Sequence, residues 1–298
     1  MASTFRGGLA RLRSTGYQFI RNTVTGKLVV TGVDRQGRGG HVARQASRLD
    51  YAARRLRRVG TGASPAGRTA VLLALATLIG FAIVLHMVRS QHTAALDLRV
   101  TRWLQRAPGP VVPVVLTAVT WVGWQPQQAL IAGGVLTLFY RTRRWAEGAF
   151  LLLALFVGAL NDLLKLVLRR PRPSAALDDI VVHGHVLGTS FPSGHVLTYV
   201  LFYGFLVYIA CTQVRRPLVR RAALAPMLAL LLLIGPSRIY LGHHWFTDTV
   251  AAYLLGGALL TGLLLAYRWA NARQAVQART RETVACGADI PPAGNRPI

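Results

Sequence analysis

Six apolar runs constrain this chain more than any other feature, because most of them approach the length of a membrane-crossing helix. A helix needs about 20 mostly apolar residues to cross the hydrocarbon core of a bilayer. The runs cover residues 69–88, 110–140, 146–168, 193–214, 222–234 and 247–267. Because the run 110–140 contains Pro113, Gln125 and Pro126, it forms either one kinked or tilted span after an interfacial piece or two short spans. We therefore predict an all-α fold, a polytopic membrane bundle of about six transmembrane helices.

The composition excludes the main alternatives to a membrane protein. Hydrophobic residues make up 52% of the chain and charged residues only 15%, against about 25% charged residues in an average soluble domain. The 35 Lys and Arg outnumber the 10 Asp and Glu, for a net charge of +25. A disordered basic chain that binds nucleic acid would be much less apolar, so no nucleic-acid partner is predicted.

Arginine-rich turns give the chain a predicted orientation. Such turns follow the second, fourth and sixth runs, at residues 141–144, 215–221 and 268–281. Because cytoplasmic loops carry an excess of Lys and Arg, we place these turns and both termini in the cytoplasm. The expected protein is integral to a bacterial cell membrane, and its outer or periplasmic loops are residues 89–109, 169–192 and 235–246. Two complete spans within 110–140 would invert every later segment.

The predicted domain organisation is a membrane domain between two cytoplasmic tails. Residues 1–68 form a basic N-terminal tail, residues 69–268 a six-span domain, and residues 269–298 a C-terminal tail. Within the first tail, apolar residues recur every three or four positions in 41–58 among arginines. This pattern predicts an amphipathic helix, which lies either on an anionic membrane surface or in solvent. The first 33 residues contain no acid, so a targeting segment is an alternative to the plain basic tail that we favour.

Three segments at the outer ends of the third, fourth and fifth runs carry residues that are suited to binding or catalysis. In chain order they contain Lys165, Arg172 and Pro173; Pro192, Ser193, Gly194 and His195; and Ser237, Arg238, His244 and Asp248. Topology alone brings these ends to the same membrane surface. Since basic residues are disfavoured on the outer side, their presence there indicates an anionic substrate.

The basic residues of these segments suit a phosphate group. Lys165, Arg172 and Arg238 can surround a tetrahedral phosphate, Arg with forked donors and Lys with a point charge. Ser193 and Gly194 stand where a helix begins after a proline, and the unpaired N–H groups of a helix N-terminus favour an anion.

The histidines suit nucleophilic and acid–base chemistry. His244 and Asp248 are four residues apart, so on a helix they would share a face. Asp248 would then accept a hydrogen bond from one imidazole nitrogen and leave the other as a nucleophile. His195 comes from a different span and is suited to protonate a leaving oxygen.

The pattern Lys-x6-Arg-Pro, Pro-Ser-Gly-His and Ser-Arg-x5-His-x3-Asp resembles the three-part signature of the type 2 phosphatidic acid phosphatase (PAP2) superfamily. No signature position is missing, and the order and spacing agree. The resemblance covers residues 69–268 and neither tail.

The resemblance implies the removal of phosphate from a membrane lipid phosphate or diphosphate without a metal or another cofactor. His244 would form a phosphohistidine, Asp248 would orient it, and His195 would protonate the leaving oxygen. The phosphoryl oxygens would be held by Lys165, Arg172, Ser193, Gly194 and Arg238. A related branch, the vanadium haloperoxidases, uses this pocket for vanadate, but those enzymes are soluble and this chain has six apolar runs.

The substrate and the acceptor remain open at the level of sequence. Phosphatidic acid, phosphatidylglycerol phosphate and undecaprenyl diphosphate all fit the pattern. A phosphotransferase that passes the phosphoryl group to another lipid would have the same pocket. A transporter or lipid-binding protein would use the cations for binding only, although transporter sites usually lie near the membrane midplane. No sequence feature specifies an oligomeric state.

Several neighbours of the signature have other predicted roles. Arg169 and Arg170 either bind lipid headgroups or extend to the membrane interface. His243 would point about 100° away from His244 on a helix, so it is not expected to belong to the site. Asn161 and Asp162 lie within the third run, where a structural role, such as an ion pair of Asp162 with Lys165, is expected.

Overall fold

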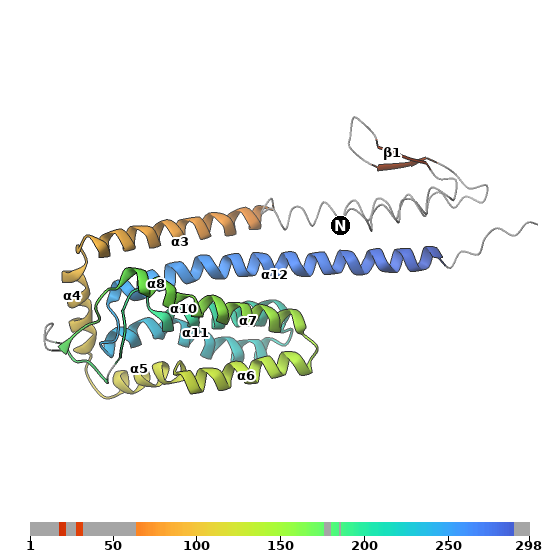
Figure 1. Cartoon of the computed structure of the whole chain (residues 1–298). Coiled ribbons are helices and arrows are strands. Elements are labelled where there is room, and N and C mark those ends of the chain that lie inside the picture. Colours follow the sequence, from red (N-terminus) through yellow and green to blue (C-terminus); the bar gives the residue numbers. More distant parts are fainter. Residues whose placement is uncertain (1–17, 22–27, 32–63, 176–179, 185, 289–298) are drawn as a thin grey trace, which may run out of the picture. The chain divides into compact units, whose positions relative to one another are not determined.

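The computed structural model describes residues 18–21, 28–31, 64–175, 180–184 and 186–288 (Figure 1). The chain divides into two units, one made of residues 1–68 and 268–298 and the other of Thr69–Tyr267. The helices are α3 (Pro65–Arg89), α4 (Ala94–Gln105), α5 (Val111–Val122), α6 (Gln125–Arg141), α7 (Trp145–Ala159), α8 (Asn161–Leu168), α10 (Gly194–Gln213), α11 (Pro217–Tyr240) and α12 (Phe246–Ala288). The amphipathic helix predicted for residues 41–58 lies outside the described residues.

The first unit contains a short strand pair that the sequence did not predict. β1 (Gln18–Arg21) and β2 (Leu28–Thr31) are antiparallel, and Phe19 lies opposite Val30. Aromatic and β-branched side chains favour such pairing. The part of the tail before residue 41, for which no regular structure was predicted, therefore includes a strand pair.

The predicted polytopic membrane bundle is confirmed by the lengths and composition of the helices. Five helical segments of the described chain are long and apolar enough to cross a membrane: Pro65–Arg89, Trp145–Lys165, Gly194–Gln213, Pro217–Tyr240 and Phe246–Ala278. Trp145–Lys165 combines α7 with α8. Large apolar side chains on α3 are exposed, such as Leu72 and Ile79, as expected for a surface that faces lipid.

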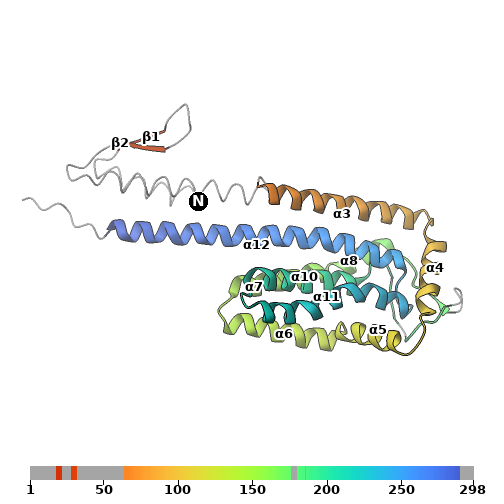
Figure 2. The ribbon, with the colours of Figure 1, turned by 180° about the vertical axis from the view of Figure 1, so that it is seen from behind.

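The run 110–140 forms two helices, and neither is among the five segments that are long and apolar enough to cross a membrane. α5 and α6 lie end to end in both ribbon views (Figures 1 and 2) and are separated at Gly123 and Trp124. Gly123 is required by close packing, because a Cβ at this position would lie 2.6 Å from Cε2 of Tyr199. Pro126 follows in the first turn of α6, where a proline is tolerated.

α10 is the central helix of the second unit. Eleven of its twenty residues are buried, and these do not keep to one face of the helix, as expected for a helix surrounded by others. Its buried side chains form the core with residues of α7, α11 and α12, including Leu151, Ile234 and Ala252. The start of α10, which carries Ser193 and Gly194, is thus fixed by a well-packed helix.

α11 continues past the point at which the sequence predicts its end. Gly235 and Pro236 predict the end of the fifth span, but the helix extends to Tyr240. A proline interrupts the backbone ladder of a helix, and here the hydroxyl of Tyr253 bridges the interruption. It accepts from the N–H of Gly235 at 3.1 Å and donates to the C=O of Leu231 at 2.6 Å. The last turns of α11, rather than a loop, therefore carry the signature residues Ser237 and Arg238.

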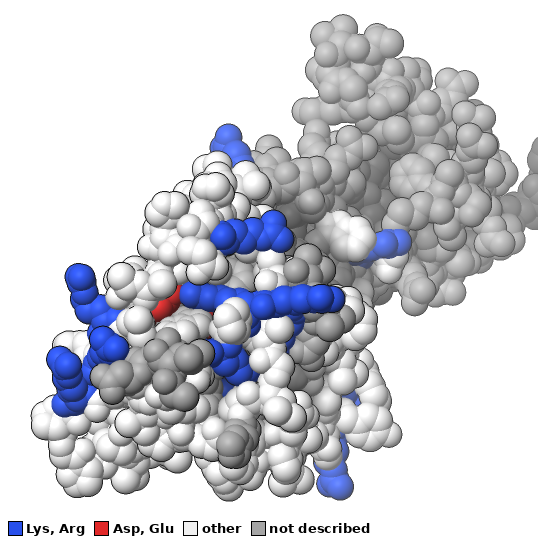
Figure 3. All heavy atoms as spheres, turned by 60° about the vertical axis from the view of Figure 1, so that its left-hand side comes forward, with Lys and Arg blue, Asp and Glu red and all other residues white. Residues whose placement is uncertain are grey.

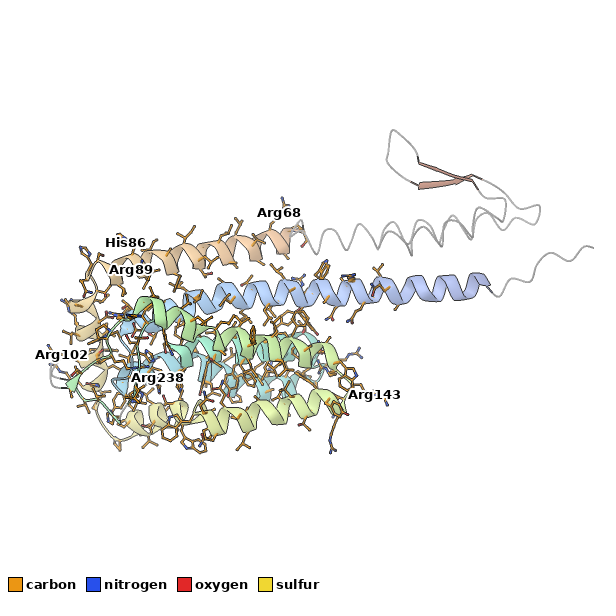
Figure 4. All side chains as sticks on the ribbon, viewed as in Figure 1. Arg68, His86, Arg89, Arg102, Arg143 and Arg238 are labelled. Atoms are coloured by element: carbon orange, nitrogen blue, oxygen red, sulfur yellow. The ribbon has the colours of Figure 1, made fainter. Side chains whose placement is uncertain are left out.

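The two ends of the second unit carry different groups of polar residues. At one end, Glu147 of α7 accepts hydrogen bonds from Gln213 of α10 and Tyr267 of α12, beside the turn with Arg143. The three signature segments gather at the other end, beside α4. Figure 4 shows this separation, with Arg143 at one end and Arg238 inside the bundle toward the other.

Candidate active site

The signature arginine of the loop after α8 lies directly against the candidate nucleophile. Nη1 of Arg172 is 3.3 Å from Nε2 of His244 and donates to the C=O of His243 at 2.6 Å. Its Nε donates to the C=O of Gly188 at 3.1 Å. Because a guanidinium only donates, Nε2 of a neutral His244 must be the nitrogen with the free electron pair.

His244 precedes α12 instead of lying on it, which corrects the prediction that His244 and Asp248 share a helical face. The reason is the start of α12, where Oδ2 of Asp248 accepts from the N–H of Trp245 at 2.8 Å in the manner of a capping box. The two residues still meet, since Nδ1 of His244 is 3.5 Å from Oδ2 of Asp248. The proton of a neutral His244 is thus on Nδ1, facing a carboxylate, while the free electron pair on Nε2 faces Arg172.

Lys165 lies over the first turn of α10. A Cβ built on Gly194 would be 3.3 Å from Nζ of Lys165 and 3.2 Å from Nδ2 of Asn161. Ser193 is fully buried and is the N-cap of α10, but its hydroxyl makes no capping bond. Since only a glycine leaves this space open, the N–H groups at the start of α10 and the Lys165 ammonium can approach one ligand together.

Asn161 lies beside Lys165 at the first turn of α10, although the sequence predicts only a structural role for it. It is 2% exposed, and its Nδ2 donates to the C=O of Pro192 at 3.4 Å. Its position four residues before Lys165 places both side chains on the same face of α8. The side chain of Asp162 is not among the described ones, so its predicted ion pair stays a prediction.

Arg238 brings a charge into the interior of the bundle. It is 2% exposed, and Figure 4 shows it inside the unit, unlike the peripheral Arg89. The preceding Ser237 anchors this turn of α11 to α5 by donating to the C=O of Leu116, and it contacts the hydroxyl of Thr120 at 2.5 Å. The C=O of Arg238 accepts from the N–H of His244 at 3.2 Å, so Arg238 is connected to the candidate nucleophile.

His195 lies on α10, beside the break between α5 and α6. A Cβ at Gly123 would be 3.1 Å from Cδ2 of His195. The neighbouring Tyr199 donates to the C=O of Val119 at 2.7 Å, which ties this face of α10 to α5. The break at Gly123, which sequence reasoning did not connect with the site, thus makes room for the imidazole.

Several buried polar atoms of the site lack a hydrogen-bond partner among the described residues. A native protein rarely leaves such atoms unpaired, because the desolvation is costly. Those of the signature residues are Oγ of Ser193, Nε2 of His195, Nε of Arg238 and Nδ1 of His244. All belong to the three segments at one end of the unit. Nδ1 of His244 faces the carboxylate of Asp248, and the other three atoms offer a polar ligand several donors.

The electrostatics keep His244, the candidate nucleophile, neutral and favour an anion. Burial, together with the charges of Arg238, Arg172 and Lys165, holds the pKa of His244 well below its ordinary value. Burial also lowers the pKa of Arg172, which the charge of Asp248 partly opposes. The end of the molecule turned forward in Figure 3 has many Lys and Arg side chains and little acidic surface.

Histidine burial gives an expected dependence of stability on pH. Burial and the charge of Arg238 lower the pKa of His243 to about 4 from 6.5. Between pH 6.5 and pH 4 the histidine is protonated in the unfolded chain but neutral in the folded one. The free energy of unfolding therefore decreases as the pH falls through this range, by at most about 1.4 kcal/mol per pH unit for each such histidine. Thermal unfolding in detergent between pH 7 and pH 4 should show a shallower fall for His243→Gln than for the wild type. A melting temperature that falls equally or more steeply in His243→Gln would contradict the lowered pKa of His243.

Arg170 belongs to a buried ion network and not to the membrane interface, which corrects both of its predicted roles. Its Nη1 is 2.6 Å from Oδ1 of Asp248, and its Nη2 is 2.7 Å from Oδ2 of Asp97 on α4. Asp97 also accepts from the N–H of Thr247 at 2.9 Å. Sequence reasoning missed Asp97 altogether.

Comparisons with known proteins identify the relatives of this chain. A family model described as the PAP2 superfamily matches residues 129–274, which include every signature residue. Phosphatidylglycerophosphatase B of Bacillus subtilis (strain 168) is 30% identical over 154 residues, which cover 49% of this chain and 71% of that protein.

A solved structure shares the helical architecture. The transmembrane PAP2 type phosphatidylglycerolphosphate phosphatase from Bacillus subtilis superposes with a TM-score of 0.54 at 23% identity, covering 64% of this chain and 94% of that one. A more distant match, Aquifex aeolicus LpxE, has a TM-score of 0.44 at 23% identity, covering 56% of this chain and 94% of that one.

Proposed function

This chain belongs to the PAP2 superfamily, and we propose that it hydrolyses a lipid phosphate through a phosphohistidine formed on His244. The observation that carries the proposal is the pair of contacts around His244. Asp248 lies on the Nδ1 side at 3.5 Å, and Arg172, which would turn to a phosphoryl oxygen, lies on the Nε2 side at 3.3 Å. A neutral imidazole oriented in this way is an activated nucleophile.

The first chemical step transfers the phosphoryl group to the protein. Nε2 of His244 attacks phosphorus, and the bond from phosphorus to the lipid oxygen breaks. The departing oxygen takes a proton from His195, so the lipid leaves as an alcohol. Asp248 stabilises the positive charge that His244 acquires.

The second step returns the protein to its starting state. A water molecule attacks phosphorus, gives its proton to His195 and displaces His244. Free phosphate leaves, so the net reaction is hydrolysis.

Preorganised charge stabilises both steps. Three cations, Lys165, Arg172 and Arg238, would hold the phosphoryl oxygens together with the hydroxyl of Ser193 and the N–H of Gly194. Each donor of this kind contributes about 100- to 1000-fold to the rate when the site excludes water. These cations supply the charge that a metal ion provides in other phosphatases, so we expect a metal-independent reaction.

We take phosphatidylglycerol phosphate as the first substrate to test, on the strength of the 30% identical relative whose name specifies it. The arginine-rich turns support a cytoplasmic position for both termini and an outer or periplasmic position for the site.

A substrate panel tests this function. Purified protein in detergent with EDTA is expected to release phosphate from phosphatidylglycerol phosphate faster than from phosphatidic acid or undecaprenyl diphosphate, at equal ratios of detergent to lipid. Activity that disappears with EDTA and returns with a divalent ion would reject the metal-independent mechanism. Transfer of the phosphoryl group to another lipid, without release of free phosphate, would identify a phosphotransferase.

A further inference from the structure

The carboxylate that orients the nucleophile is itself held by a second ion pair. Oδ1 of Asp248 is 2.6 Å from Nη1 of Arg170, while Oδ2 accepts from the N–H of Trp245 at 2.8 Å. The side chain of Asp248 is fully buried. The terminal torsion of an aspartate has a broad energy profile, so these two contacts set which oxygen faces His244.

Arg170 is in turn fixed by α4, which lies outside all three signature segments. Its Nη2 contacts Oδ2 of Asp97 at 2.7 Å, and only 1% of the Asp97 side chain is exposed. Oδ1 of Asp97 accepts from the N–H of Thr247 at 2.9 Å, and the Thr247 hydroxyl lies 3.0 Å from the same carboxylate. Asp97 thereby contacts both Arg170 and the first turn of α12, the helix that carries Asp248.

The second carboxylate next to Arg170 affects the charge that Asp248 presents to His244. A lone Arg170 would draw electron density from Asp248 and weaken its attraction for the Nδ1 proton of His244. With Asp97 on its other nitrogen, Arg170 shares its charge between two carboxylates, and the group keeps a net negative charge next to His244. A forked guanidinium can bridge two carboxylates, which the compact ammonium of a lysine does less well.

We propose that Arg170 and Asp97 are positioning residues that hold Asp248 in the orientation required to align His244. The inference rests on the proposed role of His244 as the nucleophile, and it extends the catalytic apparatus to α4. Asp97 lies outside the residues 129–274 that match the family.

Asp97→Asn is the variant that tests the proposal, because it preserves size and an acceptor for the N–H of Thr247 but removes the charge that faces Arg170. We expect kcat to fall by about 10- to 100-fold, the scale of a misplaced catalytic group, while KM stays close to the wild-type value. Arg170→Lys keeps the charge but not the forked guanidinium, so it should likewise lower kcat and leave KM nearly unchanged. This variant tests the proposal if Asp97→Asn does not fold.

Two variants control for the loss of a charge. Glu147→Gln removes a carboxylate that is paired with Arg144 at 3.1 Å at the other end of the unit. Arg99→Gln removes an exposed charge from α4 itself. Both should keep the wild-type kcat, and thermal unfolding in detergent shows how much stability each variant loses.

A double-mutant cycle separates positioning from a general effect on structure. In an Asp248→Asn background, Asp97→Asn should cause little further loss of kcat, because the residue through which it acts is already altered. Equal losses in both backgrounds, or a wild-type kcat in Asp97→Asn and Arg170→Lys, would overturn the proposal. An active His244→Ala, measured in parallel, would instead overturn the function on which the proposal rests.

Discussion

His244→Ala is expected to abolish phosphate release, with a loss of kcat of roughly 10⁴-fold or more, the scale seen when a catalytic nucleophile is deleted. The variant loses the imidazole that lies between Arg172 and Asp248, at 3.3 Å and 3.5 Å. The loss should appear in kcat, because the cations that bind the phosphoryl oxygens remain. Initial rates of phosphate release across a range of lipid concentrations measure it.

His243→Ala is the matched control for this prediction. His243 is adjacent in sequence and also buried, but its Nε2 donates to the C=O of His183 at 2.5 Å, away from the nucleophile. It should retain most of the activity. Comparable activity in His244→Ala and the wild type would remove His244 from the mechanism.

Arg238→Met is expected to lower kcat/KM by about 100- to 1000-fold, as the loss of one preorganised donor does, without lowering stability. Arg238 is buried near Arg172 and makes no ion pair among the described residues. An uncompensated buried charge is costly, so an apolar side chain of similar length should keep or raise the melting temperature. Kinetics and thermal unfolding on the same preparation measure both effects.

Arg170→Met provides the contrast. This arginine is also largely buried but contacts Asp97 and Asp248, and removing one partner of a buried ion pair costs about 3–5 kcal/mol. Its melting temperature should therefore fall well below that of Arg238→Met. The reverse order of melting temperatures would contradict the view that Arg238 is retained for binding and Arg170 for orientation.

The parts of the site that sequence predicts are those specified by local pattern and membrane topology. Apolar runs predict the spans, and span ends at one surface must lie near one another. The sequence alone therefore brings Lys165, Arg172, Ser193 and His244 together. The residue types then indicate phosphate chemistry, because cations, a helix start and a histidine with a nearby carboxylate have few other uses in combination.

The remaining parts depend on contacts between residues far apart in the chain, for which no periodicity exists. Asp97 and Arg170 are 73 positions apart, and nothing in either local sequence marks them as partners. Pro236 predicts a helix end by itself, because the bridge that keeps α11 intact comes from Tyr253, a residue of the next helix. The start of α12 after His244 likewise follows from a side-chain cap by Asp248, which spacing alone does not distinguish from one further helical turn.

Direct capture of the covalent intermediate tests the central claim. Protein incubated briefly with radiolabelled phosphatidylglycerol phosphate in EDTA is denatured in alkali, which preserves phosphohistidine, and digested for mass spectrometry. We predict a label that is stable in alkali, lost in acid and located on His244, and absent from His244→Ala. A label on another residue, or none while the wild type releases phosphate at its full rate under the same conditions, would contradict this account.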